Sequence, residues 1–231
     1  KKSEYLALQN QINPHFLYNT LEGIRAEALI AGVDSIAEMT EALATYFRYT
    51  ISQVNNLVTL EEELANVENY YYIQQFRFGS KLDLRIRYDC EDEEEALMCQ
   101  LPKLTLQPIV ENSLFHGLYE LDDRAGVICL SAERIGSYVQ IRIQDNGIGM
   151  DKGKLTEILA KKDKPVVNTK RGGYGIGNIL ERLHIYYDDD FMFEIDSAIL
   201  VGTTVTIRVP YSRNDSPQIH AERPIGGAEQ N

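Results

Sequence analysis

The segment Asp145-Asn146-Gly147-Ile148-Gly149-Met150 directly follows a stretch, Tyr138 to Gln144, in which apolar and polar residues alternate as they do in a strand. An Asn-Gly pair often marks a hairpin turn, but the residues after Met150 do not supply the returning strand that a hairpin needs. Glycines at such a strand end let the backbone approach a ligand closely, and Asp145 can accept a hydrogen bond from an adenine amino group. The segment therefore predicts one wall of a nucleotide site.

Two further segments complete this predicted site. Leu106 to Asn112 lies on a helix that we expect Pro102 to open and that runs to about Gly117. The neutral amide oxygen of Asn112 suits a magnesium ion already held by ATP phosphates. Gly173-Tyr174-Gly175-Ile176-Gly177 precedes a helix, where backbone N–H groups and the helix dipole favour phosphate. The Rossmann spacing and the Gly-Lys-Ser/Thr loop are both missing from the sequence, so the two commonest nucleotide folds fit poorly.

Cationic side chains concentrate between the glycine segments, at Lys152, Lys154, Lys161, Lys162, Lys164, Lys170 and Arg171. The same window contains glycine, proline and asparagine residues, which predict a long mobile loop. A basic loop in this place suits a lid over a polyanion, with Lys170 and Arg171 as candidate nucleotide contacts. The alternative is a lysine-rich loop that is merely solvated.

The pattern of strands and helices predicts an α/β sandwich. Strands are expected at residues 82–88, 127–132, 138–144, 191–195 and 203–209, and a helix at 177–187. The residues after 211 are polar, rich in proline and glycine, and without periodicity, so we expect a disordered tail. The chain is therefore predicted to be an α+β protein with a helical region at 1–78, a sandwich domain at 79–211 and a tail at 212–231.

In the helical region, the stretch Gln11-Ile12-Asn13-Pro14-His15-Phe16-Leu17-Tyr18-Asn19-Thr20 places one histidine in an apolar helical pattern. An imidazole with an ordinary pKa of about 6.5 is mostly neutral at pH 7 and can act as a nucleophile. A lone helical histidine is more often an ordinary surface or core residue. Because the helical period already holds upstream, Pro14 is expected to kink the helix beside His15. The alternative is that Asn13 caps a helix whose first turn contains Pro14.

Two amphipathic helices are expected on either side of Gly32 to Ser35, and a capping box at Thr59 to Glu62 predicts a third helix that reaches about Phe76. The hairpin of the first two helices has broad apolar stripes that it cannot cover by itself. We therefore expect a homodimer that completes a four-helix bundle through residues between Leu21 and Phe47. The alternative is that the hairpin packs on its own C-terminal domain.

Composition excludes several classes of protein. The chain has 231 residues and a formal net charge of −12, which argues against nucleic-acid binding. It has neither an apolar run long enough to span a membrane nor a signal peptide, and it opens within a helical pattern, so we expect a cytoplasmic fragment of a longer protein. Three cysteines at unrelated spacings form neither a disulfide framework nor a Cys-x-x-Cys pair and are expected to be reduced.

Taken together, and in their order along the chain, the segments resemble those of the LytS/YesM type of sensor histidine kinase, over roughly residues 4–211. Leu8 to Leu21 is similar to the phosphoacceptor box of that family, and Leu106 to Gly117 to its asparagine box. Asp145 to Met150 and Gly173 to Leu183 are similar to its two glycine boxes, and Gly202-Thr203-Thr204-Val205 to its closing strand. The resemblance implies a Bergerat-type ATP-binding sandwich, as in gyrase and Hsp90, and ATP-dependent phosphorylation of a histidine.

Roles for single residues also follow from the resemblance. His15 would be the phosphoacceptor, Asn112 the magnesium ligand and Asp145 the residue that recognises adenine. Thr204 would support the base, and the ends of the lid would be shaped by Gly147, Gly149, Gly173 and Gly175. Members of the family are usually membrane-anchored bacterial homodimers that pass the phosphoryl group to the receiver domain of a response regulator. Asn19, four residues after His15, would serve a phosphatase reaction; the alternative is that Asn19 only forms hydrogen bonds within the bundle.

The chain departs from the better-known histidine kinases at two positions. Those kinases have an acidic residue directly after the phosphoacceptor, where this chain has Phe16, and a lysine three residues after the asparagine, where it has Phe115. His116 or the basic lid would replace the lysine. Glu111 is a candidate catalytic carboxylate, although a Glu-Asn pair is more often a surface feature of a helix.

These departures keep two other functions open. One is a dimeric signalling module that binds nucleotide without transferring phosphate. The other is a Bergerat-type ATPase, which is disfavoured because those enzymes carry a glutamate one helical turn before the asparagine, where this chain has Pro108.

Overall fold

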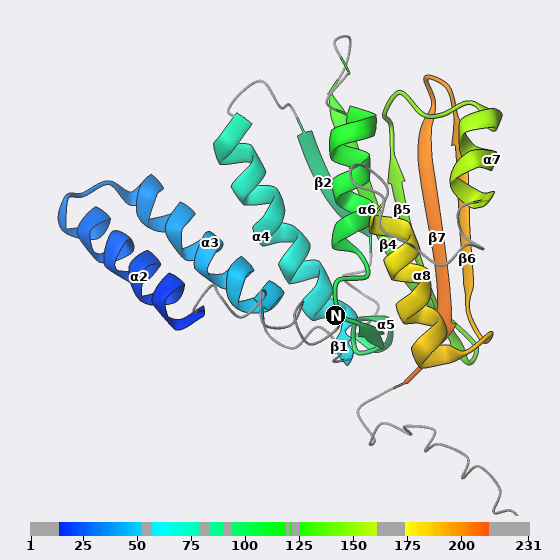
Figure 1. Ribbon diagram of the computed structural model, residues 1–231, viewed down its shortest axis with the longest axis horizontal. Coiled ribbons are helices and arrows are strands. Elements are labelled where there is room, and N and C mark those ends of the chain that lie inside the picture. Colours follow the sequence, from blue (N-terminus) through cyan, green and yellow to red (C-terminus); the bar gives the residue numbers. More distant parts are fainter. Residues whose placement is uncertain are drawn as a thin grey trace, which may run out of the picture.

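The computed structural model describes residues 14–51, 57–78, 84–89, 94–118, 121, 125–160 and 174–212. Its N-terminal part is a helical hairpin of α2 (Pro14–Ile30) and α3 (Asp34–Ile51), which pack against each other. Gly32, between them, has a φ of 68°, a left-handed conformation that suits glycine at the end of a helix. A third helix, α4 (Leu60–Phe78), packs against α3 (Figure 1).

The rest of the chain is built around one five-stranded sheet with the order β2-β4-β5-β7-β6. These strands are β2 (Leu84–Asp89), β4 (Gly126–Ile135), β5 (Tyr138–Asp145), β6 (Met192–Ala198) and β7 (Gly202–Pro210). Only the β2–β4 pair is parallel. Side chains alternate between buried and exposed along β5, so one face is covered and the other meets solvent.

Helices α6 (Gln107–Asn112) and α8 (Tyr174–Tyr187) cover the buried face of the sheet, and α7 (Lys152–Ala160) lies beside β6 (Figure 1). A π-helical segment, Ser113–Leu118, continues α6. A short helix, α5 (Glu94–Leu97), leads into β3 (Gln100–Pro102). The expected α/β sandwich is therefore present.

Helix α4 packs against helix α3 of the hairpin and also contributes to the core of the sandwich. Leu60, Val67 and Tyr70 of α4 belong to the same buried core as the sheet. In addition, β1 (Leu57–Thr59), which leads into α4, pairs with β3 in a second small sheet. Helix α4 therefore contacts both the hairpin and the sandwich, and the domain boundary expected at residue 78 stays a prediction.

The structure confirms one local prediction and corrects two others. The capping box is confirmed, because the Thr59 N–H donates to Glu62 Oε2 at 2.8 Å and the Glu62 N–H donates to Thr59 Oγ1 at 3.2 Å. The helix expected to start at Pro102 starts instead at Gln107, since Pro102 ends strand β3. The first part of the lysine-rich window is helix α7 rather than loop, and residues 161–173 lie outside the described residues.

The hairpin combines features of both expected arrangements. Helix α3 packs on α4 of its own chain, as the alternative arrangement required. Large apolar side chains of α2 and its turn are nevertheless more than a third exposed, namely Phe16, Ile24, Leu29, Ile30 and Val33. The described part of α2 begins at Pro14, so the kink depends on residues 1–13, outside the described residues, and stays a prediction. Among the described helices, none is long and apolar enough to cross a membrane.

Candidate functional site

Asp145 ends strand β5 and lies at the centre of the candidate nucleotide site. Its side chain is 3% exposed. Oδ1 accepts hydrogen bonds from the N–H groups of Gly147 at 2.9 Å and Thr203 at 3.1 Å, and Oδ2 accepts one from Ser113 Oγ at 2.7 Å. Burial raises the pKa of this carboxyl above its usual range, and the three hydrogen bonds oppose that effect. Because a carboxylate offers about four acceptor positions, Oδ2 retains capacity for one further donor.

The glycines of the first glycine box are needed for contacts within the protein. A Cβ on Gly147 would lie 2.6 Å from backbone atoms of Gly117, and one on Gly149 would lie 1.9 Å from the carbonyl oxygen of Ala198. Gly149 also has a φ of 65°, which favours glycine. The Ile148 N–H donates to the Gly117 carbonyl at 2.9 Å. The first glycine box therefore packs directly against the end of the π-helical segment, and Asp145 lies between the two.

Asn112 is the last residue of α6 and is partly buried. A π-helical turn follows it, an irregularity that is frequent at functional sites. His116 and Phe115 lie on the exposed side of this turn, while Ser113 and Gly117 face Asp145. One neutral amide oxygen fits a magnesium ion that keeps most of its ligands from phosphates and water. Among the described residues, no group of three His, Cys, Asp or Glu side chains could hold a metal by itself.

Glu111 is turned towards α3 and α4. Its Oε1 accepts a hydrogen bond from Gln107 Nε2 at 2.8 Å. The same Nε2 donates to the hydroxyl of Tyr46 on α3 at 2.7 Å, and Gln107 Oε1 accepts from Asn66 Nδ2 of α4, also at 2.7 Å. Gln107 therefore ties the asparagine helix to the neighbouring helices, while Glu111 accepts from Gln107 within α6. The structure does not bring Glu111 to His15.

The second glycine box and the closing strand differ in detail from the sequence prediction. Helix α8 begins at Tyr174, so Gly175 lies in its first turn, where unpaired N–H groups suit phosphate. Gly173, Lys170 and Arg171 lie outside the described residues. Thr204 pairs with Gln144 and points to the face of the sheet opposite Asp145, since successive strand residues point to opposite faces.

The residue beside Asp145 is therefore Thr203 rather than Thr204. In addition to its N–H contact with Asp145, its hydroxyl lies 2.9 Å from Ser197 Oγ. Sequence reasoning also missed Ser113, which binds Asp145 directly. Ser113 directly follows Asn112, and Thr203 directly precedes Thr204. Adjacency to these two predicted site residues was therefore the available signal in the sequence.

His15 lies in the first turn of α2 and is exposed, with its Nδ1 3.3 Å from Nδ2 of Asn19. The expected shared face is thus present. Helix α2 packs on α3, α3 on α4, and α4 on α6, so two helices separate His15 from the helix that carries Asn112 (Figure 1). The structure brings the Asp145 and Asn112 segments together but does not bring His15 to them.

Two protein-family models match the chain. Residues 3–82 match the model described as histidine kinase, and residues 101–213 match the model described as histidine kinase-, DNA gyrase B-, and HSP90-like ATPase. The first model includes α4, although α4 packs in the core of the sandwich.

Curated relatives include the sensor histidine kinase YesM of Bacillus subtilis, which is 36% identical over 91% of this chain, and BtsS of Escherichia coli, which is 32% identical over 91%. The chain spans only 34% of the length of either relative. Among solved structures, the histidine kinase domain of the blue-light activated kinase EL346 from Erythrobacter litoralis aligns over 85% of this chain and 96% of that chain, with 16% identity and a TM-score of 0.45.

Proposed function

The chain belongs to the YesM- and LytS-like sensor histidine kinases, and we propose that it transfers the γ-phosphoryl group of ATP to His15 and then to an aspartate of a response regulator. The observation that carries the proposal is the buried Asp145 carboxylate, held by three donors and retaining one acceptor position. That position suits the adenine amino group. We further propose that the complete protein is membrane-anchored, with this part in the cytoplasm, and that nucleic acid is not a partner.

Each residue of the site has a different role in the proposed phosphoryl transfer. Asp145 would orient the base, Asn112 would contribute one ligand to the magnesium ion that ATP carries, and the N–H groups in the first turn of α8 would bind the phosphates. Lys170, Arg171 and His116 supply positive charge or hydrogen bonds to the phosphates. Catalysis rests mainly on positioning and charge neutralisation, as in other phosphoryl transfers. His15 supplies the nucleophilic nitrogen.

Incubation with magnesium and γ-labelled ATP distinguishes this function from its alternatives. A histidine kinase gives labelled protein, a non-catalytic module binds nucleotide without turnover, and a Bergerat-type ATPase releases free phosphate only. Phe16 and Phe115 are the reason for retaining the non-catalytic alternative. We expect labelled protein. Binding of nucleotide without turnover, or release of free phosphate without labelled protein, would contradict the proposal.

We expect the chain to be a homodimer through the hairpin, because α2 exposes an apolar surface. Replacing Ile24, which is 47% exposed on α2, with lysine places a charge in the expected four-helix bundle and should shift the dimer towards monomer. Ile185→Lys is the matched control, since Ile185 is 68% exposed but lies on α8. Light scattering at micromolar concentration checks both variants. A monomeric wild-type chain, or equal dissociation of the two variants, would contradict the bundle.

Asn19→Ala should impair dephosphorylation of a phosphorylated response regulator more than it impairs autophosphorylation. An exposed side-chain pair one helical turn apart contributes only about 0.2–0.5 kcal/mol, so losing the 3.3 Å contact with His15 should change kinase activity by roughly twofold at most. An amide that positions an attacking water matters more, and we expect at least a roughly tenfold loss of phosphatase activity. Both reactions are measured on one preparation. Equal losses, or a loss of kinase activity alone, would remove the separate role of Asn19.

A further inference from the structure

The loop between β3 and α6 is held from two sides. The carboxylate of Glu63 accepts hydrogen bonds from the N–H groups of Leu104 at 2.6 Å and Leu106 at 2.8 Å. The guanidinium of Arg182 donates to the carbonyl oxygens of Lys103 and, at 2.7 Å, of Leu104. Leu104 has a φ of 60°, a strained conformation that persists only where the surroundings enforce it. Glu63 and Arg182 therefore act as a clamp that fixes residues 103–106.

Helix α3 of the hairpin reaches this clamp through Tyr49. The Tyr49 hydroxyl donates to Oε1 of Glu63, the same oxygen that accepts from the Leu104 N–H. The Lys103 ammonium lies 4.5 Å from the centroid of the Tyr49 ring. Glu63 is completely buried, and burial raises the pKa of its carboxyl while its donors, Tyr49 first among them, oppose that effect. Removing one of those donors is therefore costly to the carboxylate.

The clamp involves two elements that are connected to the candidate nucleotide site, the loop before α6 and helix α8. The clamped loop runs directly into α6, whose last residue is Asn112. Arg182 lies on α8, whose first turn contains Gly175. A second contact from α3 runs parallel to the first, because the Tyr46 hydroxyl accepts from Gln107 at the start of α6. The clamp thus joins one helix of the phosphoacceptor hairpin to two sides of the site.

We propose that Tyr49 is a positioning residue for ATP, through which helix α3 sets the loop 103–106 and, with it, the helix that carries Asn112. The inference rests on the proposed function for its consequence, but the contact itself does not depend on nucleotide. A displacement of α3 that breaks the Tyr49–Glu63 bond loosens the loop and lowers the affinity of the site. The hairpin and the ATP site are coupled through this bond.

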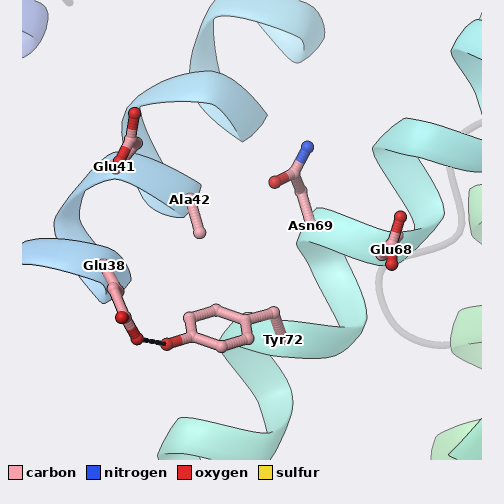
Figure 2. A pocket seen from close by; sticks show the side chains of 6 residues that line it. All are labelled: Glu38, Glu41, Ala42, Glu68, Asn69 and Tyr72. Carbon is pink, nitrogen blue, oxygen red and sulfur yellow. Dashed lines mark hydrogen bonds between the residues drawn. The ribbon is translucent and has the colours of Figure 1, made fainter. Parts of the chain in front are cut away.

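A second tyrosine–glutamate bond between the same two helices provides a matched control. The hydroxyl of Tyr72 on α4 donates to Oε2 of Glu38 on α3 at 2.9 Å (Figure 2). This pair lines a groove between α3 and α4 together with Glu41, Ala42, Glu68 and Asn69 (Figure 2). It joins α3 to α4 as Tyr49 does, but neither side chain bonds to the clamped loop. Tyr72→Phe therefore removes a hydrogen bond between the helices without touching the clamp.

The experiment compares Tyr49→Phe with Tyr72→Phe, each of which removes only a hydroxyl. The first readout is amide hydrogen exchange of a peptide covering residues 103–112 in the nucleotide-free chain. We expect faster exchange in Tyr49→Phe and wild-type exchange in Tyr72→Phe. The second readout is the dissociation constant of a fluorescent ATP analogue with magnesium. It should rise at least about fivefold in Tyr49→Phe, the lower end of usual couplings between sites, and less than about twofold in the control.

Each outcome bears on the inference separately from the proposed function. Equal exchange at 103–112 in the two variants would overturn the role of Tyr49, whether or not nucleotide binds. Faster exchange in Tyr49→Phe with unchanged nucleotide affinity would overturn the coupling. If the wild-type chain bound no nucleotide, both the proposed ATP site and its coupling to Tyr49 would be contradicted. The exchange data would still decide whether Tyr49 holds the loop.

Discussion

His15→Gln should reduce incorporation of phosphate into the protein to background while the affinity for nucleotide stays within about twofold of wild type. Glutamine has no ring nitrogen that can accept a phosphoryl group, so the acceptor is lost completely. The fold should be unaffected, because His15 is exposed and its contact with Asn19 is worth at most about 0.5 kcal/mol. Two helices separate α2 from the helix that carries Asn112, which is why nucleotide affinity should not change. Labelling with γ-labelled ATP and a binding titration measure the two quantities.

His184→Gln is the control for this variant. His184 is exposed in the last turn of α8, directly after the second glycine box, and bonds through Nδ1 to the Asp188 carbonyl at 2.8 Å. It should incorporate as much phosphate as the wild type. Retained labelling in His15→Gln, with the label on His116, His184 or His220, would assign the acceptor elsewhere.

Asp145→Asn should weaken nucleotide binding by about 10- to 150-fold, the equivalent of one hydrogen bond to a charged group at about 1.5–3 kcal/mol. The orientation of the new amide is fixed by the structure. Two N–H groups donate to the Oδ1 position, so the amide oxygen must lie there and the NH₂ group must replace Oδ2. Ser113 can rotate its hydroxyl to accept from that NH₂ group, which preserves the fold. The acceptor for the adenine amino group is then missing.

The matched control is Asp151→Asn, the same chemical change just beyond the first glycine box. Asp151 is exposed and accepts from the Lys154 N–H at 2.8 Å at the start of α7, a role that asparagine also fills. Calorimetric titration with an ATP analogue, together with thermal unfolding, checks both variants. Wild-type affinity in a folded Asp145→Asn protein would remove Asp145 from the nucleotide site.

The elements that the sequence predicted well are those that local patterns determine. Alternation located the strands around Asp145 to within a few residues, and Thr59 with Glu62 marked the start of α4. The pattern of strands and helices predicted the sandwich, and the order of the asparagine and glycine boxes carried the resemblance to the kinase family. These features depend on neighbours in the sequence, so no knowledge of long-range contacts was needed.

The features that the sequence did not reveal depend on long-range contacts. Glu63 belongs to the acidic first turn of α4 and reads as a solvated residue, yet it is completely buried and binds a loop some 40 residues away. Its position between Leu60 and Val67, on the face that enters the core, was the one local sign. The choice between Thr203 and Thr204 likewise required the register of β5 and β7, which turn chemistry and composition do not determine.

We propose that ATP bound beside Asp145 is the source of the phosphoryl group on His15. To test this directly, the purified chain is incubated with magnesium and γ-labelled ATP, and the stability and position of the protein-bound label are then determined. A phosphoramidate is labile in acid and stable in alkali. We expect label with that behaviour on the peptide that contains His15, and its absence from Asp145→Asn at low ATP concentration. Label that is stable in acid, or that maps to another peptide, would contradict the account.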